Sequence, residues 1–202
     1  GTFLKEHKDM LQCDAAIYSD GHRHESGRPI LLLGHKGMVS LEMSFTGANR
    51  DTHSMRAPSI PNPIWRMVGL LNTLKGEDGY VKIDGFYENV RIPTELEVRT
   101  AKEIPCDDEE IMERLVKNRT DNGYYYNIVF EPTCNIAGIY GGYTGEGSKT
   151  VLPNKVTVKM DMRLVPNQEP DEIVRKFKEH LVSRGYGDAQ IEFFHSSALM
   201  CR

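Results

Sequence analysis

The sequence has few of the features that mark secreted, membrane or nucleic-acid-binding proteins. Its longest aliphatic run, residues 30–33, is far too short to cross a bilayer, and nothing resembles a signal peptide. A net charge of −4 over 202 residues gives no positive potential to attract nucleic acid or an anionic membrane. The four cysteines are scattered and form no CxxC pair, which is typical of reduced thiols. These absences predict a cytoplasmic globular protein with no nucleic-acid or membrane partner.

The apolar residues that are present predict a simple order of elements. The expected strands cover residues 38–45, 80–86, 135–140, 154–165 and 189–194, and the expected helices cover residues 61–75, 93–100, 107–117 and 170–184. If residues 77–133 are an insertion, the remaining order is that of an α+β, ferredoxin-like βαββαβ plait. Such a plait has one antiparallel sheet with two helices on one face. Many unrelated functions use this fold, so function must be argued from particular residues.

A polar loop, TGANRDTHS, follows the first expected strand and holds His53. A loop fixed between a strand and a helix is a rigid mount for a reactive side chain. Taken alone, a histidine in such a loop is more often solvated than catalytic. The loop therefore offers His53 as a candidate that needs further support.

The apolar segment 13–19 ends at Asp20, which is followed by Gly21. A carboxylate at the end of a strand is a common position for a metal ligand, because the strand fixes it and the next loop leaves it open. An Asp-Gly pair alone is more often a simple turn. His22 and His24 lie in a very polar loop, where solvated side chains are the commoner case.

The glycine-rich segment GGYTGEGSKT nearly matches a phosphate-binding P-loop. It has one residue too many before Lys149 and Thr150. It is also followed by a proline and a strand, whereas a P-loop must open a helix whose N–H groups face the phosphate. The sequence therefore argues against nucleotide binding.

Several short segments, in this order, resemble the co-catalytic metallopeptidase family that includes carnosinase, acetylornithine deacetylase and succinyl-diaminopimelate desuccinylase. The matching segments are GHKG (34–37), DTHS (51–54), NP (62–63), KTVLP (149–153) and MDMRLVP (160–166). The likeness is strongest to the carnosinase-like dipeptidases. It implies a lid (dimerisation) domain over 35–195, a fragment of an α/β metal-binding catalytic domain over 1–34, and a return to that domain over 196–202. One departure is Met55, where the family usually has glycine.

The resemblance also implies an activity and assigns residues to it. Family members cleave an amide bond in dipeptides or N-acyl amino acids, using two divalent metal ions, of which zinc is the first expectation and manganese or cobalt the alternatives. Asp20 matches a metal ligand, and His53 matches a catalytic histidine that stabilises the oxyanion in the partner's site of a homodimer. Arg163, with Thr150 expected beside it, matches the groups that bind the substrate carboxylate.

The chain lacks the other metal ligands and the general base of that family. We therefore expect it to be the central part of a longer hydrolase and to be inactive alone. Two alternatives remain open. Arg163 could be a surface residue paired with Asp161, and the whole chain could be a stand-alone ferredoxin-like module for dimerisation or small-molecule binding, without catalysis.

Overall fold

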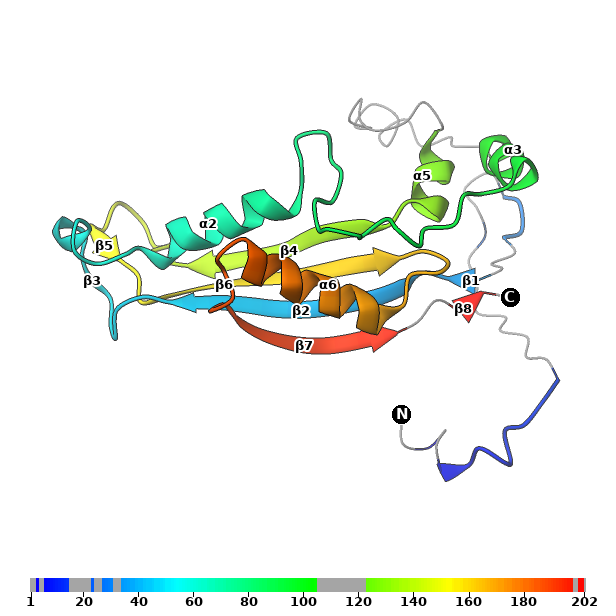
Figure 1. Cartoon of the computed structure of the whole chain (residues 1–202), viewed down its shortest axis with the longest axis horizontal. Helices are drawn as coiled ribbons and strands as arrows, with labels where there is room; N and C mark the ends of the chain where they lie inside the picture. Colours follow the sequence, from blue (N-terminus) through cyan, green and yellow to red (C-terminus); the bar gives the residue numbers. More distant parts are fainter. Residues whose placement is uncertain are drawn as a thin grey trace. The chain divides into compact units, whose positions relative to one another are not determined.

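Figure 1 shows the computed structural model of the chain. The residues that it describes are 3, 6–14, 23, 27–30, 34–104, 123–197, 200 and 201. The chain divides into two compact units, Gly1–Leu32 and Leu33–Arg202. All of the longer helices and strands described lie in the second unit.

The second unit contains four helices, a short 3-10 turn (η1) and eight strands among its described residues. In chain order these are β1 (Gly34–His35), β2 (Gly37–Thr46), β3 (Thr52–His53), η1 (Ser54–Arg56), α2 (Pro63–Leu74), α3 (Glu95–Glu103), α5 (Tyr124–Phe130), β4 (Thr133–Gly141), β5 (Val151–Leu152), β6 (Lys155–Leu164), α6 (Pro170–Ser183), β7 (Gln190–Ser197) and β8 (Met200–Cys201).

The four long strands form one antiparallel sheet in the order β4-β6-β2-β7. With α2 and α6 as the two crossover helices, this is the ferredoxin-like order, so the predicted fold is confirmed. Two short sheets complete the unit. The β3–β5 pair lies at one end of the long sheet and the β1–β8 pair at the other (Figure 1).

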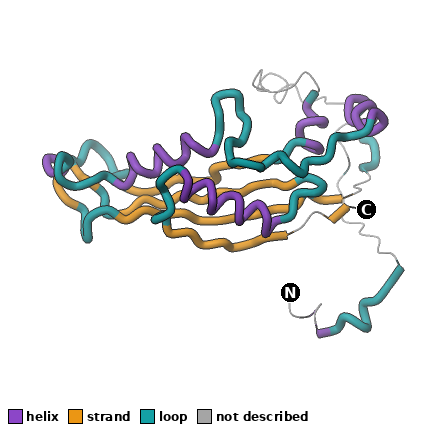
Figure 2. The backbone as a smooth tube through the Cα atoms, in the orientation of Figure 1, coloured by secondary structure: helices purple, strands orange, loops and turns teal. Residues whose placement is uncertain are grey.

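The alternation of apolar residues decides which face of the sheet is buried. Every second residue of β2 and β6 faces the helices, which cover one face of the sheet (Figure 2). α2 packs on β2 and β6, and α6 packs on β2 and β7. The buried apolar residues of the two strands are Val39, Leu41, Met43, Phe45, Val156, Val158, Met160, Met162 and Leu164. The opposite face carries the intervening side chains, most of them polar, of which Ser44 and Thr157 are buried.

The strand predicted over residues 80–86 is wrong. Only one isolated bridge forms there, between Lys75 and Val81, and tight turns follow it. Val81, Ile83 and Phe86 are buried in the core, so the apolar pattern reflects packing rather than strand pairing. The sequence also missed α5, and the helix expected over 107–117 lies outside the described residues.

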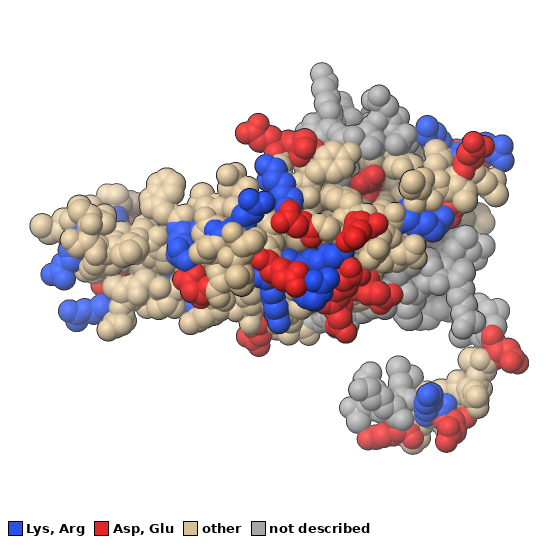
Figure 3. Space-filling view, in the orientation of Figure 1, with Lys and Arg blue, Asp and Glu red and all other residues tan. Residues whose placement is uncertain are grey.

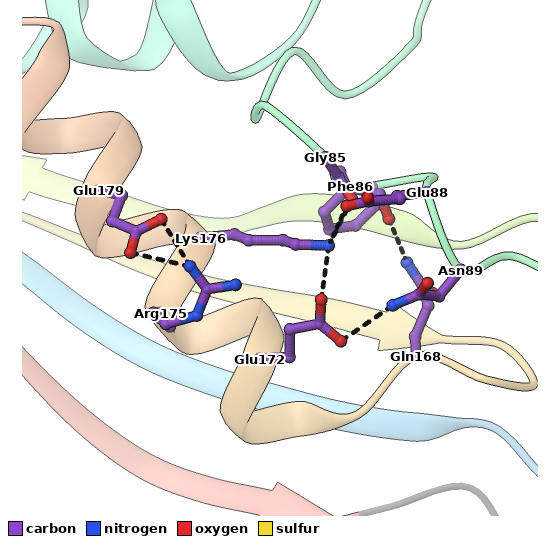
Figure 4. A network of polar contacts seen from close by, with 9 residues as sticks. All are labelled: Gly85, Phe86, Glu88, Asn89, Gln168, Glu172, Arg175, Lys176 and Glu179. Carbon is purple, nitrogen blue, oxygen red and sulfur yellow. Dashed lines mark hydrogen bonds and ion pairs between the residues drawn. The ribbon is translucent and has the colours of Figure 1, made fainter.

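A buried lysine ties this irregular segment to α6 (Figure 4). The side chain of Lys176 is only 7% exposed. Gln168 strengthens the attachment by donating a hydrogen bond to the Phe86 carbonyl at 2.7 Å. The partners of the Lys176 ammonium are the Gly85 carbonyl at 2.8 Å, the Glu88 carboxylate at 3.1 Å and the Glu172 carboxylate at 2.8 Å.

None of the helices in the described part of the chain has the length and apolar character of a membrane-spanning segment.

Candidate functional site

His53 lies at the end of β3, where its ring caps the 3-10 turn η1. Its Nδ1 accepts a hydrogen bond from the Met55 N–H at 3.1 Å, and its Nε2 lies 3.1 Å from Thr150 Oγ1. Because Nδ1 accepts a hydrogen bond, it carries no proton. The neutral ring therefore has its proton on Nε2 and donates it to the Thr150 hydroxyl.

The loop around His53 is exposed but held on both sides. β3 pairs with β5, and the Ser54 N–H donates to the Thr150 carbonyl at 3.2 Å. The Asp51 carboxylate accepts a hydrogen bond from the Asn154 N–H at 2.9 Å. The imidazole is thus an exposed N–H donor on a fixed backbone. Such a group can stabilise negative charge that develops on an oxygen placed against it.

Arg163 lies near the end of β6, on the open face of the sheet. In the register it is opposite Met38 of β2 and Thr133 of β4. Its side chain is 50% exposed, and its Nε is 3.4 Å from the Asp161 carboxylate. The predicted placement on a polar face with Lys159 and Asp161 is confirmed. The pair with Asp161, which the sequence offered as the structural alternative, is also present.

The expectation that Thr150 lies beside Arg163 is wrong. Between them, the nine residues from Lys155 to Arg163 lie in one strand, and their eight steps of about 3.4 Å span about 27 Å. Thr150 is at the β3–β5 end of the sheet, with His53, and Arg163 is at the β1–β8 end (Figure 1). The candidate residues therefore form two groups at opposite ends of one sheet.

Sequence reasoning missed Lys36, the lysine of the GHKG segment. Its ammonium donates a hydrogen bond to the Glu131 carbonyl at 2.5 Å. Burial lowers the pKa of Lys36 to about 8, the Glu131 carboxylate opposes this change, and the positive charge of Arg163 adds to it. The alternation of side chains along β2 could have identified Lys36. Lys36 is two residues before Met38, which pairs with Arg163, so Lys36 and Arg163 share one face of the sheet.

A family model described as the peptidase dimerisation domain of the M20 family matches residues 33–189. The chain belongs to this family. The match covers the plait from β2 to α6, with the insertion included, and ends just before β7.

Relatives of this M20 domain are dipeptidases. The chain is 27% identical over 184 residues to the Cys-Gly metallodipeptidase of Schizosaccharomyces pombe, which covers 86% of the chain and 38% of that protein. It is 29% identical over 174 residues to the Beta-Ala-His dipeptidase of Mus musculus, covering 83% of the chain and 35% of that protein. The chain thus spans well under half the length of these curated relatives.

Solved structures agree on the fold. The crystal structure of an M20 family metallo-carboxypeptidase, Sso-CP2 from Sulfolobus solfataricus, superposes with a TM-score of 0.90 and 32% identity. The match covers 98% of this chain and 46% of that one. Human carnosine dipeptidase 1 has the same fold, with a TM-score of 0.76 and 22% identity.

The M20 metallopeptidase family implies divalent metal ions, and the described residues do not supply a site for them. No group of three or more His, Cys, Asp or Glu side chains that could hold a metal occurs within the described ranges. Asp20, the predicted ligand, lies outside those ranges. No catalytic step that runs through a metal is therefore assigned to the described part of the chain.

Proposed function

We propose that this M20 domain is the lid and dimerisation part of a metal-dependent dipeptidase, in which His53 and Thr150 of one copy complete the substrate site of a second copy. The observation that carries the proposal is the separation of the two groups of candidate residues. A dipeptide is about 7 Å long when extended, whereas about 27 Å of strand separates the ends of the sheet. One substrate cannot touch both groups in one copy, but it can in a dimer.

In this scheme each group has a distinct chemical task. Arg163 holds the substrate's carboxylate through the two parallel N–H groups of its fork. The Nε2–H of His53 in the partner copy, which donates to Thr150 in this structure, turns its hydrogen bond to the oxygen of the amide carbonyl as water adds to that carbonyl. Removing one such donor typically costs about 2.7–4 kcal/mol, or roughly a hundred- to a thousandfold in kcat.

Exposed apolar residues beside the open edge of the sheet support a second copy as the partner. β4 is an edge strand, and Ile139 and Tyr140 on it are 57% and 51% exposed. On the adjacent outer face of α2, Trp65 is 75% exposed. This part of the surface carries few charges, whereas α6 carries mixed acidic and basic groups (Figure 3). Helix and edge strand together offer a continuous surface for self-association.

The names of the relatives favour dipeptides over N-acyl amino acids as substrates. Both substrate classes end in a free carboxylate, so Arg163 suits either. We further propose two divalent ions, zinc first, with Asp20 among their ligands in the complete enzyme, which we expect to be cytoplasmic. The chain alone is expected to be inactive.

A complementation experiment in the full-length enzyme tests the trans arrangement. Asp20→Ala removes the predicted metal ligand, and His53→Ala removes the donor. Each homodimer should be nearly inactive. In an equal mixture that has exchanged subunits, half of the dimers are mixed and each has one intact site, so about one quarter of the wild-type activity should return. No recovery after exchange, with heterodimers verified by mass, would contradict the trans role.

The alternative is a stand-alone module without catalysis. It predicts a reading frame close to 202 residues, whereas the enzyme predicts one at least twice as long, since the chain covers only 38% and 35% of two relatives. The length of the source gene separates the two.

A further inference from the structure

We infer that Lys36 is a second carboxylate-binding cation beside Arg163, so that both side chains together select substrates with a free C-terminal carboxylate. The inference deepens the proposed function and rests on it. It adds a specificity-determining residue that the sequence motifs do not assign.

The sheet order brings the two cations together. β6 lies between β2 and β4. Lys36 directly precedes β2, yet its ammonium reaches the carbonyl of Glu131, two residues before β4. Its side chain must therefore cross the end of β6, where Arg163 lies. If the β2–β6 register is extended by one residue, Lys36 and Arg163 become diagonal neighbours, roughly 7–8 Å apart.

Both cations keep hydrogen-bond donors that a ligand can use. An ammonium group has three donors, and among the described residues Lys36 uses one of them, toward the Glu131 carbonyl. Arg163 approaches Asp161 only through Nε. Within the described ranges its two terminal nitrogens, which carry most of the guanidinium N–H groups, have no hydrogen-bond partner. Together, Lys36 and Arg163 can donate hydrogen bonds to one carboxylate from two directions.

The charges around the pair favour a shared anion. Burial is the main cause of the lowered pKa of Lys36, and the like charge of Arg163 adds to it, because two neighbouring cations repel each other. The neighbouring acids are Glu131 and Asp161, and Asp161 also accepts a hydrogen bond from Asn135 at 3.1 Å. With a pKa of about 8, Lys36 is mostly charged at neutral pH. A carboxylate placed between Lys36 and Arg163 would relieve their repulsion and attract both.

The test compares Lys36→Met and Lys36→Arg with a matched control, Lys159→Met, in the full-length enzyme. Lys159 is on the same open face but is paired with Glu42, 3.9 Å away. The substrates are alanyl-alanine and its C-terminal amide. We expect Lys36→Met to raise KM for the free acid by about ten- to a hundredfold with little change in kcat, because a hydrogen bond to a charged group is lost. Lys36→Arg should retain most of the affinity, and Lys159→Met should match the wild type.

For the amidated substrate, Lys36→Met should have no effect. Equal losses on both substrates, or no loss on either, would overturn the inference. If the wild-type enzyme cleaves no dipeptide, the proposed function fails. The role of Lys36 is then tested separately, by calorimetric measurement of the binding of N-acetylglycine and of its amide. Wild-type protein that binds the acid no better than the amide, or Lys36→Met protein that keeps the preference, would also overturn it.

Discussion

The buried imidazole of His180 joins α6 to α2. Its Nε2 lies 3.0 Å from Thr73 Oγ1, and that hydroxyl donates its proton to the Leu70 carbonyl at 2.7 Å. Nε2 must therefore carry the ring's proton, and Nδ1 is buried without a partner among the described residues. A second proton would have to go to Nδ1. Burial lowers the pKa of His180, the Arg184 charge adds to this, and Asp84 opposes it.

This lowered pKa predicts an acid-sensitive fold. The folded pKa lies below the value of about 6.5 for an unfolded histidine, so the unfolded chain takes up the proton first as pH falls. Stability should therefore fall as pH drops below about 6.5. As the pH is lowered from 7.5 to 5.5, the urea midpoint of His180→Leu should rise relative to that of wild type. The control, His35→Leu at an exposed position, should show no such rise. A constant difference between wild type and His180→Leu would show that the pKa of His180 is the same in the folded and the unfolded protein.

Single residues also show where sequence reasoning stops. His53 was identified from its loop and the resemblance, but its contact with Thr150 was not, because β3 and β5 are two-residue strands without a periodic signal. Thr150, thirteen residues before Arg163, was placed beside it from the resemblance to the family. The regular strand between them already implied a long separation. Lys36 was passed over because GHKG was treated only as a family marker.

Among the elements, the segment after α2 needs a glycine at position 85. Gly85 has φ +73°, and a Cβ there would lie 3.1 Å from Lys176 Cε and 3.2 Å from Lys176 Nζ. Gly147 has nearly the same φ, +74°, but a Cβ there would meet nothing within 4 Å. The two glycines thus separate backbone strain from crowding of the buried lysine.

We expect both Gly→Ala variants to be destabilised, because left-handed backbone costs an alanine about 1–2 kcal/mol. Gly85→Ala should lose about 1–3 kcal/mol more, because the Lys176 hydrogen bonds must shift. Urea unfolding of the two variants at pH 7 measures the difference. Equal losses would mean that Lys176 moves aside freely and does not hold the segment in place.

The long elements were predictable and this segment was not, for a physical reason. β2, β6, α2 and α6 each bury one regular face, so the period of their apolar residues reports their structure. In residues 80–86, tight turns place Val81, Ile83 and Phe86 in the core. The spacing of these apolar residues resembles that of a strand, although only one isolated bridge forms there. What holds them is a set of long-range polar contacts to α6, and these have no period in the sequence.

At the scale of the whole molecule, the arrangement of the plait determines how two copies would meet. α2 is the crossover helix nearer the edge strand β4, since it packs on β2 and β6 while α6 packs on β2 and β7. A Cβ built on Gly142, just after β4, would lie 3.3 Å from Ile64 Cδ1 of α2. Trp65 and the edge strand therefore lie on the same side of the domain, and Val182 of α6, 68% exposed, belongs to the other helix.

Trp65→Asp should therefore abolish self-association, and Val182→Asp, an equally drastic change on the other helix, should not. An aspartate at the centre of an apolar interface leaves a buried charge without a partner, which typically costs several kcal/mol. Sedimentation velocity over a concentration series of the full-length enzyme measures the change. Because His53 and Arg163 of one copy are too far apart to share a substrate, the monomeric variant should also lose roughly a hundred- to a thousandfold in kcat, like His53→Ala. A monomeric Trp65→Asp enzyme with wild-type activity would show that one copy suffices, and a dimeric one would place the interface elsewhere.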